Sequence, residues 1–158
     1  MPLLIADVIP ELVEAIVLIE PKGPPFQQPF GSEPGRAWGL TDIPMTYEPP
    51  LTAPADFVTA RHPAPEEGLI DCIIQADDPP PRQLINLVDK PILLVTGEAS
   101  YHAPYDYCTV KFLQQAGCHK TEFYELAKMG VLGNGHMLFM EKNSQEIQAL
   151  VHKWIQEA

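Results

Sequence analysis

Three short apolar runs stand out along the chain. They are AIVLI at residues 15–19, ILLVT at residues 92–96 and, with more polar positions, EFYEL at residues 122–126. The first two are continuous and partly β-branched, without the alternation of apolar and polar residues that marks a strand with one wet face. Runs of this length and kind are typical of strands buried on both faces of a parallel sheet. The pattern therefore predicts three parallel strands.

Helical periodicity appears between and after these runs. Residues 104–116 begin with a proline, which suits a first helical turn, and stop at Gly117. Near the end of the chain, Asn143 and Glu146 predict a capping box at the start of a helix. That helix is predicted from apolar residues at helical spacing, namely Ile147, Leu150, Val151, Trp154 and Ile155. Residues 3–9 resemble the end of another amphipathic helix. The order of elements predicts an α/β fold, with three parallel strands and flanking helices.

A proline-rich segment separates the first two predicted strands. Fifteen of the 18 prolines fall between Pro21 and Pro91. Proline fixes φ and removes a hydrogen-bond donor, so we expect little regular structure here. A disordered linker is one interpretation, but linkers rarely carry many large apolar groups. The large apolar groups interspersed in this segment include Phe26, Phe30, Trp38, Leu40, Ile43, Met45, Tyr47 and Phe57. We therefore expect an ordered, irregular, cap-like insertion at about residues 24–89, lying over a cleft.

Length and charge limit the classes of function. The chain has 158 residues, 46% of them hydrophobic, which is enough for a single domain with a real core. Its formal net charge of −11 argues against nucleic acid, whose phosphates require clustered Lys and Arg, and against anionic membrane surfaces. No apolar run approaches the roughly 20 residues that cross a bilayer. We expect neither a nucleic-acid partner nor a membrane.

The cysteines and the first residues bear on the compartment. Cys72, Cys108 and Cys118 are odd in number and lack metal-ligand spacing, so buried thiols or a reducing compartment are expected. The first residues contain no basic region followed by a cleavage site of the signal-peptide type. A cytoplasmic location is therefore favoured, although a targeting segment upstream of Met1 would change that expectation.

Ionisable side chains follow each predicted strand. Glu20 comes directly after the first, and Glu98, His102 and Asp106 follow the second in GEASYHAPYD. His136 lies after the third, in GNGHM. Carboxyl ends of parallel strands gather ligands and catalytic groups. A carboxylate that orients a histidine, and a histidine that takes a proton from a nucleophile, are two members of a catalytic triad. Taken alone, His136 is equally well explained as a structural histidine in a glycine-rich turn.

Three segments together resemble a known family. The runs AIVLIEPKGPPF, PILLVTGEASYHAPYD and GNGHMLFMEKNSQEIQALVHKWI resemble the C-terminal half of α/β-hydrolase-fold proteins. They look most like esterase-type members whose acid is a glutamate at the end of the strand after the nucleophile helix. The resemblance covers nearly the whole chain and is loosest in the proline-rich insertion. It implies a partial α/β-hydrolase fold. It also implies that the reaction is hydrolysis of a carboxylic ester or lactone through an acyl-enzyme.

The resemblance also implies roles for individual residues. His136 would be the catalytic histidine and Glu20 the acid. Many members place an Asp in a Gly-x-x-Asp turn after the next strand, but here that turn runs from Gly97 to a serine. The departure favours Glu20 and leaves Glu98 and Asp106 as alternative acids. The candidates for lining a substrate pocket are Phe26, Phe30, Trp38, Tyr47 and His102.

No serine has the context of a nucleophile. The family requires a G-x-S-x-G-like elbow between a strand and a helix. Ser32 lies in GSEPG, away from any predicted element, Ser100 lies in the acid loop, and Ser144 begins the last helix. The resemblance places the elbow upstream of Met1. We therefore expect a truncated or split domain that is inactive alone, and whether the chain by itself is an enzyme stays open.

Two other interpretations stay open. One is a non-catalytic, hydrolase-derived protein that acts through a partner subunit, because an exposed first strand would favour a homo- or hetero-oligomer. The other is a metal-dependent hydrolase that uses Glu98, His102, Asp106 and His136, although no two histidines have close metal-binding spacing. The primary expectation is a small ester or lactone substrate, with no cofactor and no metal.

Overall fold

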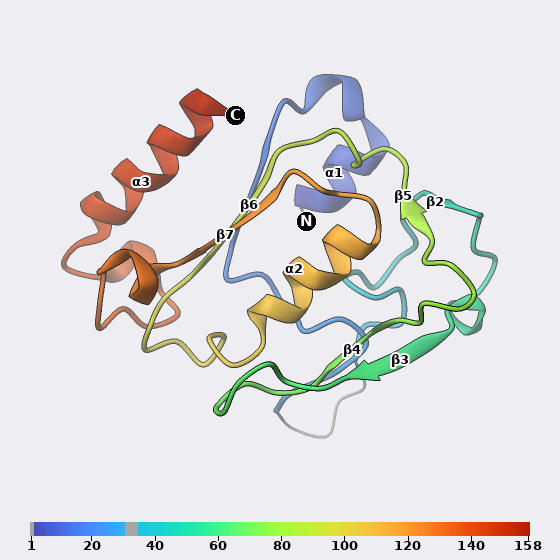
Figure 1. Ribbon diagram of the computed structural model, residues 1–158. Coiled ribbons are helices and arrows are strands. Elements are labelled where there is room, and N and C mark those ends of the chain that lie inside the picture. The colour runs from blue at the N-terminus through green and yellow to red at the C-terminus, as the bar shows by residue number, and fades with distance from the viewer. Residues whose placement is uncertain (1, 31–34) are drawn as a thin grey trace.

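The predicted parallel sheet is present and has three strands. A computed structural model describes residues 2–30 and 35–158. Strands β1 (Ile16–Ile19), β6 (Ile92–Thr96) and β7 (Thr121–Glu125) pair in parallel in the order β1-β6-β7. The three predicted strands are confirmed to within one residue at each end. Figure 1 shows β6 between its two neighbours, so β1 forms one edge of the sheet.

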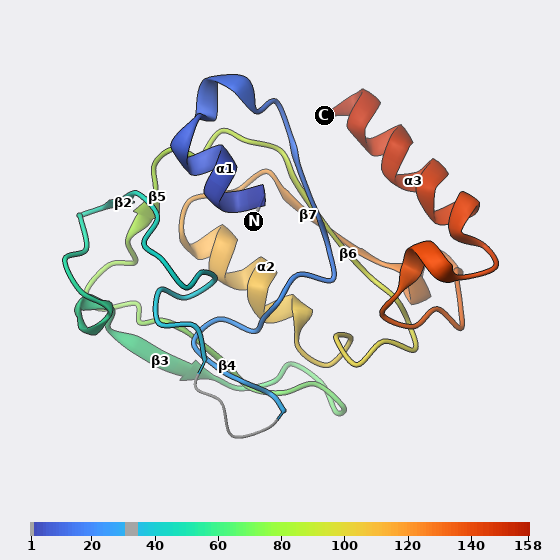
Figure 2. The same ribbon diagram turned by 180° about the vertical axis from the view of Figure 1, so that it is seen from behind.

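Helices cover both faces of this sheet. Helices α1 (Pro2–Val8) and α2 (Asp106–Gln115) pack on one face, and α3 (Ser144–Glu157) packs on the other (Figure 2). All five residues of β6 are buried, which explains their unbroken apolar pattern. None of the helices in residues 2–30 and 35–158 has the length and apolar character needed to span a membrane. The fold class is therefore mixed α/β, with a three-stranded parallel sheet between helices.

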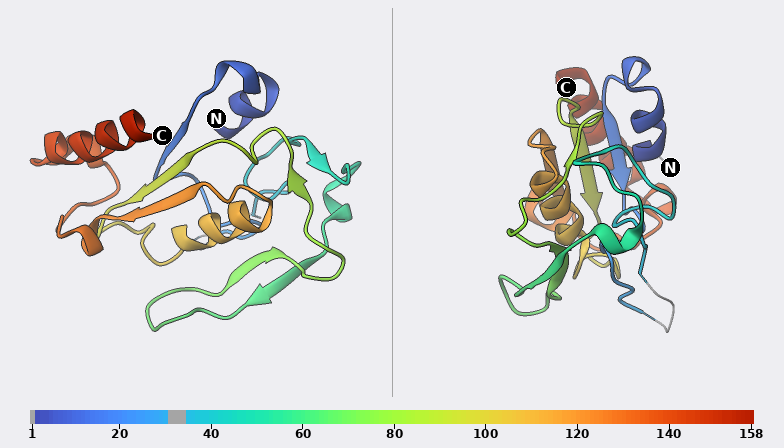
Figure 3. Two further views of the ribbon diagram at one scale, coloured as in Figure 1. Left: turned by 45° about the horizontal axis from the view of Figure 1, so that its top comes forward. Right: turned by 90° about the vertical axis from the view of Figure 1, so that its right-hand side faces the viewer.

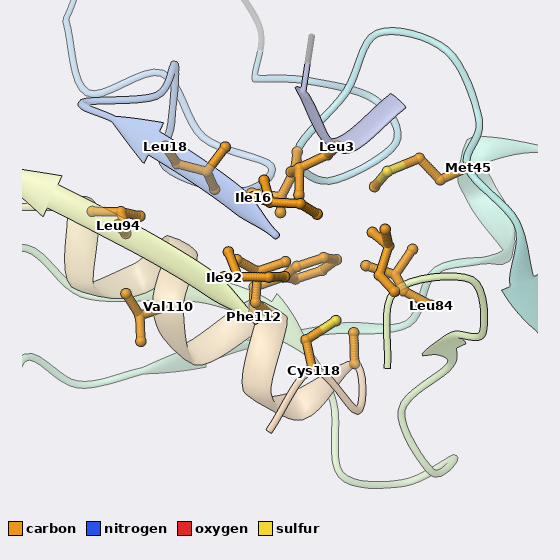
Figure 4. Close-up of a cluster of buried hydrophobic side chains, with 14 of the residues drawn as sticks. Leu3, Ile16, Leu18, Met45, Leu84, Ile92, Leu94, Val110, Phe112 and Cys118 are labelled. Carbon is orange, nitrogen blue, oxygen red and sulfur yellow. The ribbon is translucent and has the colours of Figure 1, made fainter. Parts of the chain in front are cut away.

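The larger core lies between the sheet, α1, α2 and the insertion. Figure 4 shows Ile16, Ile92 and Phe112 meeting there, with Met45 and Leu84 of the insertion closing the far side. A second, smaller core lies between the other face of the sheet and α3, which contributes Ile147 and Trp154. Its other buried members are Leu93, Val95, Leu126, Val131 and Leu138. The insertion is therefore part of the main core and not a detached linker.

Regular structure is present within the insertion, contrary to the expectation from its prolines. Strands β2 (Tyr47–Glu48) and β5 (Gln83–Leu84) pair antiparallel, as do β3 (Thr59–His62) and β4 (Cys72–Gln75) (Figure 3). The prolines flank these strands and lie within none of them. A strand only two to four residues long fits between prolines without losing a ladder hydrogen bond.

Short 3-10 helices complete the chain. They are η1 (Pro10–Leu12), η2 (Pro54–Asp56), η3 (Leu126–Met129) and η4 (Leu138–Met140). In η4, which follows His136, only Leu138 is buried, whereas Phe139 and Met140 are exposed. The apolar residues after His136 therefore do not form the continuous core that their sequence resembles.

The predicted capping box of α3 is not formed. Asn143 precedes the helix but makes no side-chain cap hydrogen bond. Its Oδ1 instead accepts a hydrogen bond of 2.6 Å from Nδ2 of the buried Asn134. This contact, with a residue nine positions earlier, ties the start of α3 to the loop that carries His136.

Two of the three cysteines are not free thiols. Cys72 of β4 and Cys108 of α2 form a disulfide, while Cys118 is buried and free. The expectation of reduced cysteines is therefore wrong for this pair. Their 36-residue separation gives no local pattern, and the bond anchors the insertion to α2.

Candidate active site

The loops after the three parallel strands bring a histidine and a carboxylate into contact. Glu20 follows β1, and His136 lies in the loop between η3 and η4. Nδ1 of His136 lies 2.6 Å from Oε2 of Glu20, although 116 residues separate them. The two side chains that sequence reasoning chose first therefore meet at one rim of the sheet.

Glu20 is buried and fully engaged. Its Oε1 accepts a 2.8 Å hydrogen bond from the backbone N–H of Gly97, and its Oε2 accepts one of 2.8 Å from the Ser100 hydroxyl. Such partners are what a buried carboxylate requires. Glu20 also has a φ of +44°, in the left-handed region that non-glycine residues seldom occupy. The backbone is therefore held in an uncommon conformation at the residue whose carboxylate meets His136.

Gly97 is needed where two loops approach each other. A Cβ at this position would lie 2.5 Å from the backbone oxygen of Asn134, closer than side chains are found. That same oxygen accepts a 2.9 Å hydrogen bond from the N–H of Ala99. Glycine at position 97 thus lets the loop after β6 contact both Glu20 and the loop that leads to His136.

The His136 ring has one open edge and one stacked face. Its side chain is 35% exposed, whereas the Glu20 side chain is fully buried. The ring of His102 lies parallel to it, with centroids 4.7 Å apart and an interplanar angle of 1°. Tyr101 contacts it at a tilt, with centroids 4.8 Å apart. The imidazole is therefore held among aromatic rings but still reaches solvent.

His102 belongs to a second buried pair. Its Nδ1 lies 3.1 Å from Oδ1 of Asp106, and the hydroxyl of Thr96 donates a 2.6 Å hydrogen bond to Oδ2 of Asp106. Burial raises the pKa of Asp106, and the hydrogen bonds from His102 and Thr96 oppose that shift only in part. Asp106 therefore does not contact His136 as an alternative acid but holds His102.

A cavity of about 340 Å³ opens beside the pair. Its lining residues are Glu20, Lys22, Gly23, Gln28, Pro29, Phe30, Tyr101, His102, Tyr105 and His136. Two of the five predicted pocket residues, Phe30 and His102, lie here. Phe26 instead packs in the core against Phe57 and Phe112, and Tyr47 is buried there as well. The half-buried Trp38 is outside the lining, with its backbone oxygen 3.4 Å from the Tyr47 hydroxyl.

The remaining candidate groups lie elsewhere or have other partners. Glu98 is exposed and accepts a 2.7 Å hydrogen bond from the N–H of Gly133. Ser32 lies outside the described residues. Ser100 donates to Glu20, and Ser144 is the first residue of α3. Within the part of the chain that the structure describes, no serine hydroxyl is hydrogen-bonded to the His136 ring.

One trio has the residue types of a metal site. Ligand atoms of Glu20, His102 and His136 all lie within 4.8 Å of one another. However, the two rings are parallel, so the in-plane lone pairs of their nitrogens do not converge on one point, and each Nδ1 already faces a carboxylate. Glu98, part of the metal set considered from the sequence, is absent from this trio. The geometry favours two hydrogen-bonded pairs over shared coordination.

Sequence reasoning missed the groups that hold these pairs. Thr96 and Tyr101 were not singled out, Gly97 was noted only as the start of a turn, and Ser100 was considered only as a replacement for an Asp and as a nucleophile. Their signal was position, since all four lie at or just after the end of β6. The pattern of residue types alone did not show which atoms they would contact.

The site is therefore a histidine–glutamate pair at the carboxyl ends of parallel strands in a mixed α/β fold. No family model matches the chain, and no solved structure matches it. A curated protein, "Probable secreted lipase phiG" from Fungal sp. (strain ATCC 74256), is 45% identical to it over 155 residues. The match covers 97% of this chain and 42% of the relative.

These comparisons correct two expectations. The predicted assignment to the α/β-hydrolase fold superfamily is wrong as made, because neither a family model nor a solved structure supports it; what is shown is similarity to a protein named as a lipase. The favoured cytoplasmic location is also wrong. The similar protein is named as secreted, and the Cys72–Cys108 disulfide is of a kind that persists in oxidising compartments.

Proposed function

We propose that this chain carries the histidine–acid half of a carboxylic ester hydrolase. The observation that carries the proposal is the 2.6 Å contact between Nδ1 of His136 and a carboxylate oxygen of the fully buried Glu20. The 45% identity to a protein named as a probable lipase supports the ester class. The chain spans 42% of the length of that relative.

The geometry assigns a role to each nitrogen of the His136 ring. With Glu20 ionised, Nδ1 carries a hydrogen and donates it to Oε2, so Nε2 is left as the base. Nε2 would take the proton from a hydroxyl as that oxygen attacks the ester carbonyl. It would then return the proton to the leaving alcohol, and water would repeat the cycle on the acyl-enzyme. Glu20 would orient the ring and stabilise its protonated form throughout.

The nucleophile would come from outside the described residues. Ser100, the serine nearest the pair among those described, donates to Glu20 and supports the acid. A Ser-His-Glu triad would therefore need a serine other than Ser100 and Ser144. The proposed consequence is that this chain alone hydrolyses esters no faster than its own His136→Ala variant does.

The cavity beside the pair favours an ester or lactone with an apolar part. Phe30, Tyr101 and Tyr105 line it, with centroids of Phe30 lying 5.9 Å from Tyr101 and 6.2 Å from Tyr105. Apolar and aromatic walls with a few convergent polar groups are typical of small-molecule sites. Phe30 is also half exposed and so is available for contact.

Secretion is proposed on the same grounds as the correction above. The disulfide joins β4 to α2, next to the turn that holds His102 and Asp106. A chain exported to an oxidising compartment would form this bond and keep it. Peptide mass spectrometry of the secreted protein without reduction tests this. The peptides that contain Cys72 and Cys108 are expected to be found linked to each other.

The test is a chimera. This chain replaces the matching 155-residue segment of the relative, and hydrolysis of p-nitrophenyl butyrate is measured beside the isolated chain. The chimera is expected to be active and the isolated chain inactive, and His136→Ala in the chimera should lower kcat by about 10⁴-fold. His152→Ala, on the exposed face of α3, is the matched control and should retain activity. A folded chimera whose activity survives His136→Ala would contradict the proposal.

A second function is favoured by the free edge of the sheet. Among the residues that the structure describes, no strand pairs with the outer side of β1. Ile19 at its end is 50% exposed, and Val8 and Leu12 before it are also exposed. A strand edge beside apolar side chains is a template for another chain. In this alternative the chain is a non-catalytic subunit. Light scattering after gel filtration would support it by showing a stable oligomer and would contradict it by showing a well-folded monomer.

A further inference from the structure

A second histidine lies against His136 and has no part in the proton transfer described above. The two rings are parallel to within 1°, with centroids 4.7 Å apart. The His102 side chain is 4% exposed, whereas that of His136 is 35% exposed. Tyr105 covers His102 further, with centroids 4.9 Å apart. A buried imidazole in aromatic surroundings needs hydrogen-bond partners to be stable there.

His102 is anchored through both its side chain and its backbone. Nδ1 faces Asp106, which is itself held by the hydroxyl of Thr96. The backbone oxygen of His102 accepts hydrogen bonds of 2.9 Å and 3.0 Å from the N–H groups of Tyr105 and Asp106. Its N–H donates a 3.0 Å hydrogen bond to Oγ of Ser100. The ring therefore presents a face that the fold holds in place.

His136 is held far less firmly. It lies in a loop between Gly135 and an exposed methionine, and the only side-chain hydrogen bond recorded for its ring, among residues 2–30 and 35–158, is the one to Glu20. One hydrogen bond at Nδ1 still allows small rotations about χ1 and χ2, which tilt the plane of the ring while Nδ1 stays within reach of Oε2. A flat surface at stacking distance removes those rotations. The direction in which Nε2 points depends on them.

We propose that His102 is a positioning residue whose face fixes the plane of the His136 ring and keeps Nδ1 on Glu20. Ser100 connects the two pairs, because its Oγ accepts from the His102 N–H and its hydroxyl donates to Glu20. The loop after β6 thus holds the acid through Gly97 and Ser100 and the histidine through His102. That this arrangement serves catalysis rests on the proposed function. That His102 orients His136 does not depend on it.

The experiment reads the tautomer of His136 by NMR on the isolated chain with ¹⁵N-labelled imidazoles. At a pH where the His136 ring is neutral, its ¹⁵N shifts report which nitrogen carries the hydrogen, and a His136→Gln variant assigns the signals. Three substitutions separate the contributions of His102. His102→Ala removes the ring face, His102→Phe keeps a face without the Asp106 link, and His102→Gln keeps a polar link without the face.

The wild-type ring is expected to carry its hydrogen on Nδ1, held by Glu20. In His102→Ala and His102→Gln, the ratio of the Nε2–H to the Nδ1–H tautomer should rise about fivefold, in line with the loss of a stacked aromatic contact. In His102→Phe, that ratio should stay within about twofold of the wild type. The proposal is overturned if His102→Ala keeps the wild-type ratio, or if His102→Phe fails to restore it.

Loss of folding is controlled separately. The same series is made in an Asp106→Asn background, which removes the carboxylate that the His102 variants would leave unpaired in the interior. Signals of His152, an exposed residue of α3, should not change across the series. The NMR experiment does not measure turnover. An inactive chimera would therefore contradict the proposed function but would not affect the positioning role of His102. An unchanged tautomer would sink the positioning role while leaving the proposed function standing.

Discussion

The two histidine–carboxylate pairs of this protein differ in span and in exposure. His102 and Asp106 are four residues apart at the start of α2, and both side chains are almost completely buried. Glu20 and His136 are 116 residues apart, and the histidine is about one-third exposed. Both histidines line the cavity of about 340 Å³, but the His102 side chain is 4% exposed, whereas that of His136 is 35% exposed.

This difference shows which pair suits chemistry and which suits support. A proton-transfer group must reach its substrate, so a sealed histidine is poorly placed for that task. A sealed, hydrogen-bonded ring is rigid, however, and a rigid ring can hold a mobile neighbour. Functional groups keep their geometry only when the residues around them are fixed. The predictions below test that division of roles, from the largest expected effect to the smallest.

Breaking the distant pair should give the largest effect. In the active chimera, Glu20→Gln should lower kcat for p-nitrophenyl butyrate by about 10³- to 10⁴-fold, because an amide presents a donor or a weaker acceptor to Nδ1 and no longer stabilises the charged ring. KM should change little, since substrate contacts are untouched. Steady-state kinetics measure both constants. An unchanged kcat would show that Glu20 is not the acid.

Breaking the local pair should cost stability. His102→Leu leaves the buried carboxyl group of Asp106 without one hydrogen-bond partner, which should lower the free energy of unfolding by about 1–3 kcal/mol. Urea denaturation of the isolated chain, followed by tryptophan fluorescence, measures the change. His152→Leu, at an exposed site, should shift it by less than about 0.5 kcal/mol. If the two substitutions changed the free energy of unfolding equally, the buried hydrogen bond between His102 and Asp106 would not contribute to stability.

The local pair should also make stability depend on pH. Burial raises the pKa of Asp106 in the folded protein above the ordinary value of about 4. The folded state therefore binds this proton more tightly than the unfolded state does. The resulting stabilisation is fully present below about pH 4 and is lost as the pH rises through the folded-state pKa.

Asp106→Asn removes this titration and should flatten the pH profile. The free energy of unfolding of the wild type, relative to that of the variant, should fall as the pH rises from about 4, by at most about 1.4 kcal/mol per pH unit. Urea midpoints across that range give the comparison. A wild type that gains stability over the variant with rising pH would reverse the expected sign.

The smallest effect is expected outside both pairs. Glu98→Gln changes an exposed carboxylate whose structural contact is the N–H of Gly133. An exposed hydrogen bond of this kind should change the free energy of unfolding by less than about 0.5 kcal/mol. Activity of the chimera should stay within about twofold. A loss comparable to that of Glu20→Gln would instead identify Glu98 as the acid.

Some of the fold was predictable from the sequence because burial leaves a pattern. The run at 92–96 was recognisable as a strand since all its residues are buried, and the run at 15–19 since Ile16 and Leu18 are buried and Val17 is half-buried. The β2–β5 and β3–β4 pairs were missed because strands of two to four residues between prolines show no periodicity. The disulfide was missed for a similar reason, as a spacing of 36 residues carries no local information.

The candidate site was predictable only in outline. The rule that parallel strands end at one rim made Glu20 and His136 two of five candidates, and the resemblance to esterase-type proteins selected them. The structure brings these two together. The choice among Glu20, Glu98 and Asp106 needed distances. The pocket residues divided in the same way: Phe30 lines the cavity, whereas Phe26 lies in the core. Residue type alone does not distinguish an aromatic wall from an aromatic core.

By itself, the sequence determined the buried strands, the helices around them and the set of ionisable groups at the strand ends, because these follow from local hydrophobic spacing. Tertiary structure alone decided which carboxylate meets which histidine, that His102 stacks on His136, and that Cys72 pairs with Cys108. Three of those contacts, Glu20 with His136, His102 with His136 and Cys72 with Cys108, join residues 116, 34 (136 − 102) and 36 positions apart. Hydrogen bonds and stacking act over a few ångströms, so they depend on where the folded backbone places each side chain and not on distance along the chain.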